Sequence, residues 1–177
     1  MDRNCLENLE PYAFQYLKNL RKLSLSQNNI LRIKAFNFHN ASLDKLMMLN
    51  LSNNRIGNVE SCSFIKLINL KRLDLSSNQI SDLDEYTLQG LDKLIALDLS
   101  YNKLVKVDNH LVFGHMTQLV SFAINKNPLK TKINNRDVIA VSNSDLEFEE
   151  LYEHAENEDR DDAKKVEKTD NENCNLV

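Results

Sequence analysis

An asparagine recurs along this chain at nearly constant spacing, and it constrains the fold more than any other feature. The intervals are 26, 24, 24 and 25 residues, between Asn28, Asn54, Asn78, Asn102 and Asn127. Each asparagine stands in the same frame, LxxLxLxxNxL, as in the stretch LDLSSNQI that begins at Leu73. A frame repeated at such a period predicts a stack of similar units, each of which buries its apolar side against its neighbours.

Within the frame, apolar and polar residues alternate over a few positions, which is typical of a short strand with one buried face. More widely spaced apolar residues separate one frame from the next, so we expect parallel strands joined by return segments on the other side of the sheet. The apolar residues of the return segments should complete the core. They are Leu9, Phe14 and Leu17; Ile33 and Phe38; Val59, Phe64 and Leu67; Leu83, Leu88 and Leu91; and Val107, Val112 or Phe113, and Met116.

The frame resembles the leucine-rich repeat family, and in particular the typical 24-residue animal subclass found in Toll-type and other extracellular receptors. Five full frames and two partial ones extend the resemblance over about residues 4–151. The resemblance implies an α/β solenoid with a curved parallel sheet on the concave face and loops or short helical turns on the convex face. In the family the asparagines form a ladder inside the turn. A side-chain amide suits this role because it can both donate to and accept from buried backbone groups.

The repeat begins in the middle of a frame. Asn4, Cys5 and Leu6 correspond to the end of a repeat whose strand would precede Met1. We therefore expect a partial, uncapped first coil. Either the chain is a fragment of a longer protein, or its open end is covered by a partner or by self-association.

Residues 1–151 are predicted to form the solenoid domain and residues 152–177 a separate tail. Residues 145–151 read DLEFEEL, which indicates a degenerate strand with a polar edge that caps the solenoid. From Glu153 to the C-terminus there are 9 acidic and 4 basic residues and no apolar period. This composition predicts an acidic, disordered tail.

The sequence contains no recognisable catalytic, cofactor or metal chemistry. Its 3 glycines cannot form a phosphate-binding loop, and its 3 widely spaced cysteines match no paired-cysteine metal site. His110 and His115 have the wrong spacing for a zinc pair on a helix. The net charge of −4 argues against nucleic acid as a partner, and no window approaches the ~20 apolar residues of a membrane span. We therefore expect no enzymatic activity, no cofactor and no membrane span.

Candidate binding residues lie where side chains of the strands point away from the core, on the predicted concave face. Basic residues, two methionines and an isoleucine begin the strands, and polar or aromatic residues follow them. Exposed methionine and arginine are enriched at protein interfaces, and long basic side chains can cover an apolar floor. The candidates for contact with a protein ligand are Lys22, Met48, Lys71, Arg72, Asp74, Asp98 and Tyr101.

These observations favour a non-enzymatic module that binds a protein ligand, in a receptor-like or innate-immune role implied by the resemblance. The alternatives are an assembly unit that self-associates through its first coil, and an intracellular scaffold with an acidic regulatory tail. Asn40, in the pattern Asn-Ala-Ser, is a glycosylation candidate if the protein is exported. The resemblance favours an extracellular or cell-surface location. The chain has no apolar signal segment, so it would be cytoplasmic if Met1 is the true start.

Overall fold

The computed structural model of the chain describes residues 2–39 and 43–130. All of them belong to one unit, Met1–Val141. The predicted cap at residues 145–151, the tail at 152–177 and the glycosylation candidate Asn40 lie outside the described residues.

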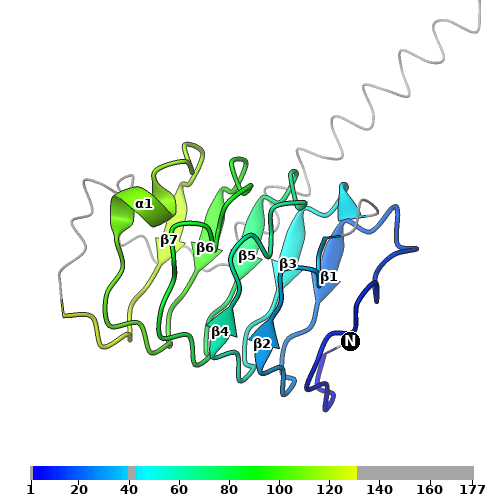
Figure 1. Ribbon diagram of the computed structural model, residues 1–177, viewed down its shortest axis with the longest axis horizontal. Helices are drawn as coiled ribbons and strands as arrows, with labels where there is room; N and C mark the ends of the chain where they lie inside the picture. Colours follow the sequence, from blue (N-terminus) through cyan, green and yellow to red (C-terminus); the bar gives the residue numbers. More distant parts are fainter. Residues whose placement is uncertain (1, 40–42, 131–177) are drawn as a thin grey trace, which may run out of the picture. The chain divides into compact units, whose positions relative to one another are not determined.

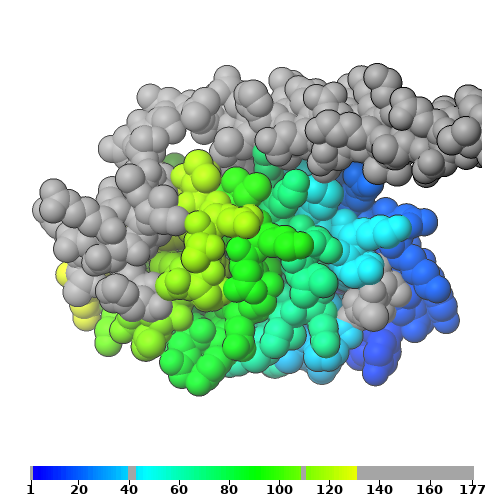
Figure 2. Space-filling view, turned by 90° about the horizontal axis from the view of Figure 1, so that it is seen from above, coloured from blue at the N-terminus to red at the C-terminus, as the bar shows by residue number. Residues whose placement is uncertain are grey.

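Each predicted frame contributes one short strand to a five-stranded parallel sheet. Figure 1 shows these strands side by side in the order of the chain, one from each coil. Figure 2 shows the coils themselves following one another from the blue to the yellow end of the described chain. The strands are β1 (Lys22–Ser24), β3 (Met48–Asn50), β5 (Arg72–Asp74), β6 (Ala96–Asp98) and β7 (Ser121–Ala123).

The return segments consist mainly of turns. A second, two-stranded parallel sheet joins β2 (Arg32–Ile33) to β4 (Asn58–Val59), away from the larger sheet in Figure 1. The last described return segment contains the helix α1 (Asn109–Phe113). The architecture is therefore the predicted solenoid of parallel coils.

A continuous apolar core fills the space between the sheet and the return segments. The inward residues of the strand frames are fully buried in the middle coils, as at Leu51 and Leu75, and partly buried in the end coils, as at Leu20 and Phe122. On the return side, Phe14, Phe38 and Phe64 stack with successive ring centroids 5.8 and 5.9 Å apart. The residues predicted to complete the core from the return segments are buried with one exception. Leu17 is 38% exposed, so its assignment to the core was wrong: it lies in the first described coil, which packs against another coil on one side only.

The repeated asparagine holds each coil to the next. The side-chain nitrogen of Asn78 donates to the carbonyls of Leu75, in its own coil, and Leu51, in the coil before, at 3.1 and 3.0 Å. Its Oδ1 accepts a 3.0 Å hydrogen bond from the backbone nitrogen of Ile56. Asn54 and Asn102 repeat this pattern in their own coils. The predicted structural role of the asparagines is confirmed, because these bonds satisfy buried backbone groups that no strand could pair.

Replacement of Asn78 should therefore destabilise the solenoid. We expect Asn78→Ala to lower the free energy of unfolding by about 2 kcal/mol, because it leaves the buried Ile56 nitrogen without a partner and removes one of the two amide hydrogen bonds to the Leu51 carbonyl. Urea unfolding followed by circular dichroism measures the change. Gln79→Ala, at the exposed neighbouring position, is the matched control and should cost little. Equal losses in the two variants would contradict the role assigned to the amide.

Candidate functional site: the outer face of the sheet

The outer face of the five-stranded sheet is the side opposite the leucine core, and three columns of residues cross it from coil to coil. The register of the strands aligns the leading column, Lys22, Met48, Arg72, Ala96 and Ser121. It also aligns the middle column, Ser24, Asn50, Asp74, Asp98 and Ala123. The turn column, just beyond the strands, consists of Gln27, Asn53, Ser77, Tyr101 and Lys126.

The leading column is less accessible than the sequence predicted. Lys22, on the edge strand β1, is exposed, and Lys71, just before β5, is half-buried. Met48 and Arg72, however, are only 5% and 4% exposed. Both lie on interior strands with a neighbouring strand on each side. The prediction that these two side chains form an exposed basic and methionine-rich patch is therefore wrong.

The middle column combines a structural role with negative charge. Asp74 Oδ1 accepts hydrogen bonds from the backbone nitrogen and hydroxyl of Ser76, at 2.9 and 2.7 Å. Asn50 Oδ1 makes the same two bonds with Ser52 in the preceding coil. These bonds hold the end of each strand as it enters the turn, and they leave the half-buried carboxylates of Asp74 and Asp98 side by side on the outer face.

The electrostatics of Asp74 follow from this position. Burial removes water from its carboxylate and raises its pKa above the ordinary 3.8, and the charge of Asp98 at the same register acts in the same direction. Hydrogen bonds from Ser76 and Ser52 oppose the rise without cancelling it. The two carboxylates therefore make the centre of the outer face a place where a cationic or hydrogen-bond-donating group would be favourable.

Tyr101 is the large side chain that projects from the turn column. It is 57% exposed and its φ is 54°, in the left-handed region that L-residues rarely adopt. The other members of the column have φ between 53° and 58°. The backbone nitrogen of Tyr101 donates to the carbonyl of Asn125 in the next coil at 3.0 Å, and Ser77 makes the equivalent bond to Ser100 at 2.9 Å. The ladder between coils thus fixes the backbone that presents Tyr101.

The structure thus brings Asp74 and Asp98 together at one register, with Tyr101 in the turn that follows β6. It does not join them to an exposed basic patch. Sequence reasoning missed three aromatic residues on the return segments, Tyr12, Phe36 and Tyr86, which are 63%, 44% and 49% exposed. Their common signal is their place two residues before a core position of the return segment.

Within 2–39 and 43–130, no group of three or more histidine, cysteine or acidic side chains is arranged to hold a metal ion. The ring of His115 lies 3.0 Å from the carbonyl of Leu88, and the side chain of His110 is outside the described part. No helix in the described part of the chain is long and apolar enough to cross a membrane.

Comparisons with known proteins agree with this architecture. Residues 44–104 and residues 19–41 each match a family model described as leucine rich repeat. The crystal structure of a TLR13–ssRNA13 complex matches with a TM-score of 0.68 and 32% identity over 78% of this chain. An internalin from Listeria monocytogenes matches with a TM-score of 0.53 and 27% identity over 71% of this chain. No curated protein sequence matches significantly.

Both similar structures are much longer than the part they share with this chain. The match covers 19% of the TLR13 chain and 34% of the internalin chain. What the alignment establishes is the fold of the shared coils.

The burial of Asp74 leads to a test based on pH. Because its pKa is raised in the folded state, the folded protein holds this proton more tightly than the unfolded chain does, so the stability contributed by protonation is lost as pH rises through the folded pKa. Asp74→Asn removes that loss and can accept both Ser76 bonds, as Asn50 does for Ser52. We expect the variant to be more stable than the parent at pH 7, with a smaller advantage near pH ~3. Urea unfolding at both pH values measures this; a constant difference would show that ionisation of Asp74 is not its source.

Proposed function

We propose that this chain, whose residues 19–41 and 44–104 are leucine-rich repeats, is a non-enzymatic protein-interaction module that binds a protein ligand on the outer face of its sheet. The observation that carries the proposal is Tyr101, a 57% exposed aromatic side chain presented from a fixed backbone beside strand β6. Tyrosine is among the residues that contribute most to binding energy at protein interfaces.

The rigidity of the outer face supports this role. Each strand is joined to its neighbours through backbone hydrogen bonds, and the Asn ladder and the turn column tie the strand ends together. A surface that is already ordered loses little conformational entropy when a partner binds, so few strong contacts are needed. Asp74 and Asp98 would accept hydrogen bonds from the ligand or pair with its cations, and Tyr101 would supply apolar contact.

A protein ligand fits this face better than a nucleic acid does. TLR13 is described in complex with single-stranded RNA, but here the centre of the outer face carries the two adjacent carboxylates of Asp74 and Asp98. These charges repel a phosphate backbone, whose binding depends on lysine and arginine contacts. A receptor-like role in recognition, as the resemblance to Toll-type repeats implies, is therefore proposed with a protein as the ligand.

Self-association is the second candidate, and the edge of the sheet favours it. Among the described strands, β1 has a partner strand, β3, on one side only. Its Lys22 is exposed at this edge, while Asp2 accepts hydrogen bonds from the Ser24 hydroxyl and the Ser26 nitrogen, at 2.6 and 3.0 Å. An edge strand is a ready template for a second chain.

The ligand-binding proposal is tested by photo-crosslinking at Tyr101. We expect a benzoylphenylalanine at this position to give a discrete protein adduct in cells that express the chain naturally. The same group at Ile68, which is 53% exposed but lies between β4 and β5, is the control and should give none. Adding Asp98→Lys should reduce the Tyr101 adduct about tenfold, because it reverses a charge within the contact. Equal adducts at both positions, or indifference to Asp98→Lys, would refute the assignment.

Self-association is tested separately by light scattering. If β1 pairs with a second copy, the full chain should show twice its mass of 20.5 kDa as concentration rises. Pairing through β1 brings two copies of the exposed residue 22 to the same interface, so Lys22→Asp, on an edge that already carries Asp2, should shift the transition to higher concentration. A constant monomer mass across the series rules the candidate out.

A further inference from the structure

The return segments expose a second column of side chains, on a different part of each coil from the outer face. Phe14, Phe38 and Phe64 stack in the core, so residues at equivalent places before them are also aligned from coil to coil. The backbone nitrogen of Cys62 donates to the carbonyl of Tyr86 at 2.9 Å, which extends the alignment to the next coil. We call the exposed or half-buried residues two positions before the core residues the aromatic column: Tyr12, Phe36, Cys62 and Tyr86.

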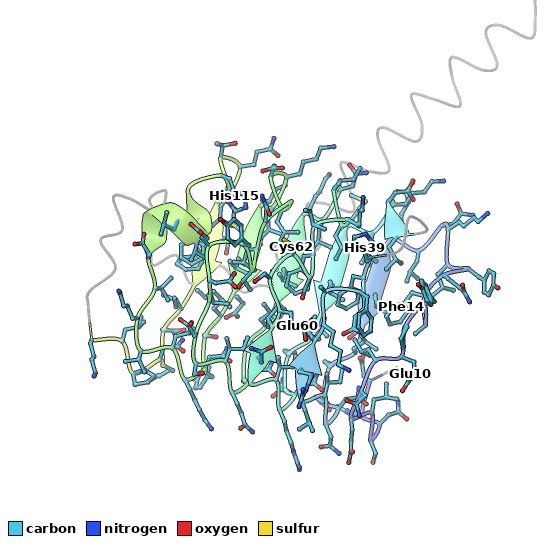
Figure 3. The ribbon with its side chains drawn as sticks, in the orientation of Figure 1. Glu10, Phe14, His39, Glu60, Cys62 and His115 are labelled. Atoms are coloured by element: carbon cyan, nitrogen blue, oxygen red, sulfur yellow. The ribbon has the colours of Figure 1, made fainter. Side chains whose placement is uncertain are left out.

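Beside it runs a charged column, two residues earlier in each coil: Glu10, Lys34, Glu60, Asp84 and Asp108. Four of its five members are acidic and exposed, and Glu85 adds a further exposed carboxylate beside Tyr86. In Figure 3, Glu10 precedes Phe14 and Glu60 precedes Cys62 along return segments that run in the same direction. The two columns are therefore adjacent over four coils.

Hydrogen bonds fix the acidic side chains in place. Glu60 Oε2 accepts a 3.0 Å bond from the backbone nitrogen of Ala35 in the preceding coil. Asp84 accepts from the hydroxyls of Ser61 and Thr87 and from the backbone nitrogen of Tyr86. These bonds give the acidic residues a structural role. They also keep the carboxylates of Glu60 and Asp84 beside the aromatic column, where unbonded side chains would move freely in solvent.

The contacts of Asp84 and Tyr86 set the ionisation of both groups. Partial burial works against ionisation of Asp84, but the hydrogen bonds from Ser61, Thr87 and Tyr86 outweigh it and lower the pKa of Asp84 below its ordinary value. The hydrogen bond with Glu85 and the charges of Glu85 and Asp84 raise the pKa of Tyr86. Asp84 therefore stays charged at neutral pH, and the ring of Tyr86 stays neutral.

One cation already rests on the aromatic column. The Lys34 ammonium lies 5.5 Å from the centroid of the Phe36 ring, within the range of a cation–π contact. Lys34 comes from the charged column, where it is the basic exception. The chain thus contains one example of a cation–π contact on this surface, in the coil whose member of the charged column is a lysine.

We propose that the aromatic and charged columns together form a docking surface for an extended lysine- or arginine-rich segment of a partner protein. Cationic side chains of the segment pair with Glu10, Glu60, Asp84 and Glu85, and their stems lie across the rings of Tyr12 and Tyr86. The charge of the surface and the Lys34 contact select a basic partner.

The spacing of the coils matches such a segment. The stacked phenylalanines, one from each coil, have ring centroids 5.8 and 5.9 Å apart, which indicates the approximate spacing of the coils on the return side. An extended chain rises about 3.3 Å per residue and places alternate side chains on the same face, so its same-face side chains recur every ~6.6 Å. A peptide with lysine at alternate positions can therefore present one cation to each coil.

The inference is independent of the function proposed above, because it uses none of the residues of the outer face. Tyr101, of similar exposure to Tyr86 but on the outer face, provides a matched control. A result for one face leaves the other face to be judged on its own experiment.

The test uses a fluorescein-labelled (Lys-Ser)6 peptide and fluorescence anisotropy with the full chain in about 0.15 M salt. Tyr86→Ala should weaken binding about two- to fivefold, which is the size of a surface cation–π contact. Glu85→Gln should weaken it in the same direction. Lys34→Glu should tighten it by a similar factor, because it removes a repulsive charge and completes the acidic column. Tyr101→Ala should leave the affinity unchanged, and a (Glu-Ser)6 peptide should not bind.

Comparison of variants within the full chain keeps the contribution of every other acidic residue, including those after Glu153, constant. Thermal melts confirm that each variant folds, and Glu85→Gln and Lys34→Glu carry the test should Tyr86→Ala prove unstable. The proposal is overturned if Lys34→Glu binds no more tightly and Glu85→Gln no more weakly than the parent. It is overturned equally if Tyr101→Ala weakens binding as much as Tyr86→Ala does.

Discussion

The side-chain amide of the repeated asparagine is the interaction on which every other part of this solenoid depends. Strands of three residues cannot pair all the backbone groups of a coil, because the chain turns away from the sheet at once. At Asn78 one amide serves the carbonyls of two coils and the nitrogen of Ile56. These bonds join each coil to the next with equivalent residues in a fixed alignment. That alignment turns isolated positions of the sequence into columns, and the two surfaces of the described coils are built from such columns.

The core and the sheet could be predicted from sequence because their residues obey a period with a physical direction. In a strand, alternation assigns each side chain to one face, so Leu73 and Leu75 had to be buried and Asp74 had to lie on the outer face. Exposure within that face does not follow from alternation. Met48 and Arg72 lie on it as predicted, yet they are buried because the strands on each side of theirs carry neighbouring side chains at the same register.

The return segments were harder to interpret for a related reason. Turns have no period of their own, so nothing local indicates whether Tyr86 points inward or outward. The position of Tyr86 can be inferred only from the core residue two positions later. Even the core positions are not fully predictable in the first coil, because Leu17 is exposed although its counterparts Leu67 and Leu91 are buried. The left-handed backbone conformation of the turn column could not be predicted from the sequence either. Ser77 and Tyr101 adopt a left-handed φ without being glycine, and the hydrogen bonds that their backbone nitrogens donate to the next coil hold this conformation.

The two surfaces should respond differently to their surroundings although both carry negative charge. On the outer face, Asp74 is largely withdrawn from water, and its interactions are weakly screened and sensitive to proton concentration. On the return segments, Glu10, Glu60 and Glu85 are exposed, so their attraction for a basic segment falls as salt rises through the range in which the Debye length shrinks below ~10 Å. A partner held by Tyr101 and the half-buried carboxylates would therefore remain bound at salt concentrations that release a basic peptide. One solenoid can thus carry two binding surfaces that differ in their resistance to salt. This is possible because the residues that build the coils are separate from those exposed on the outer face and on the return segments.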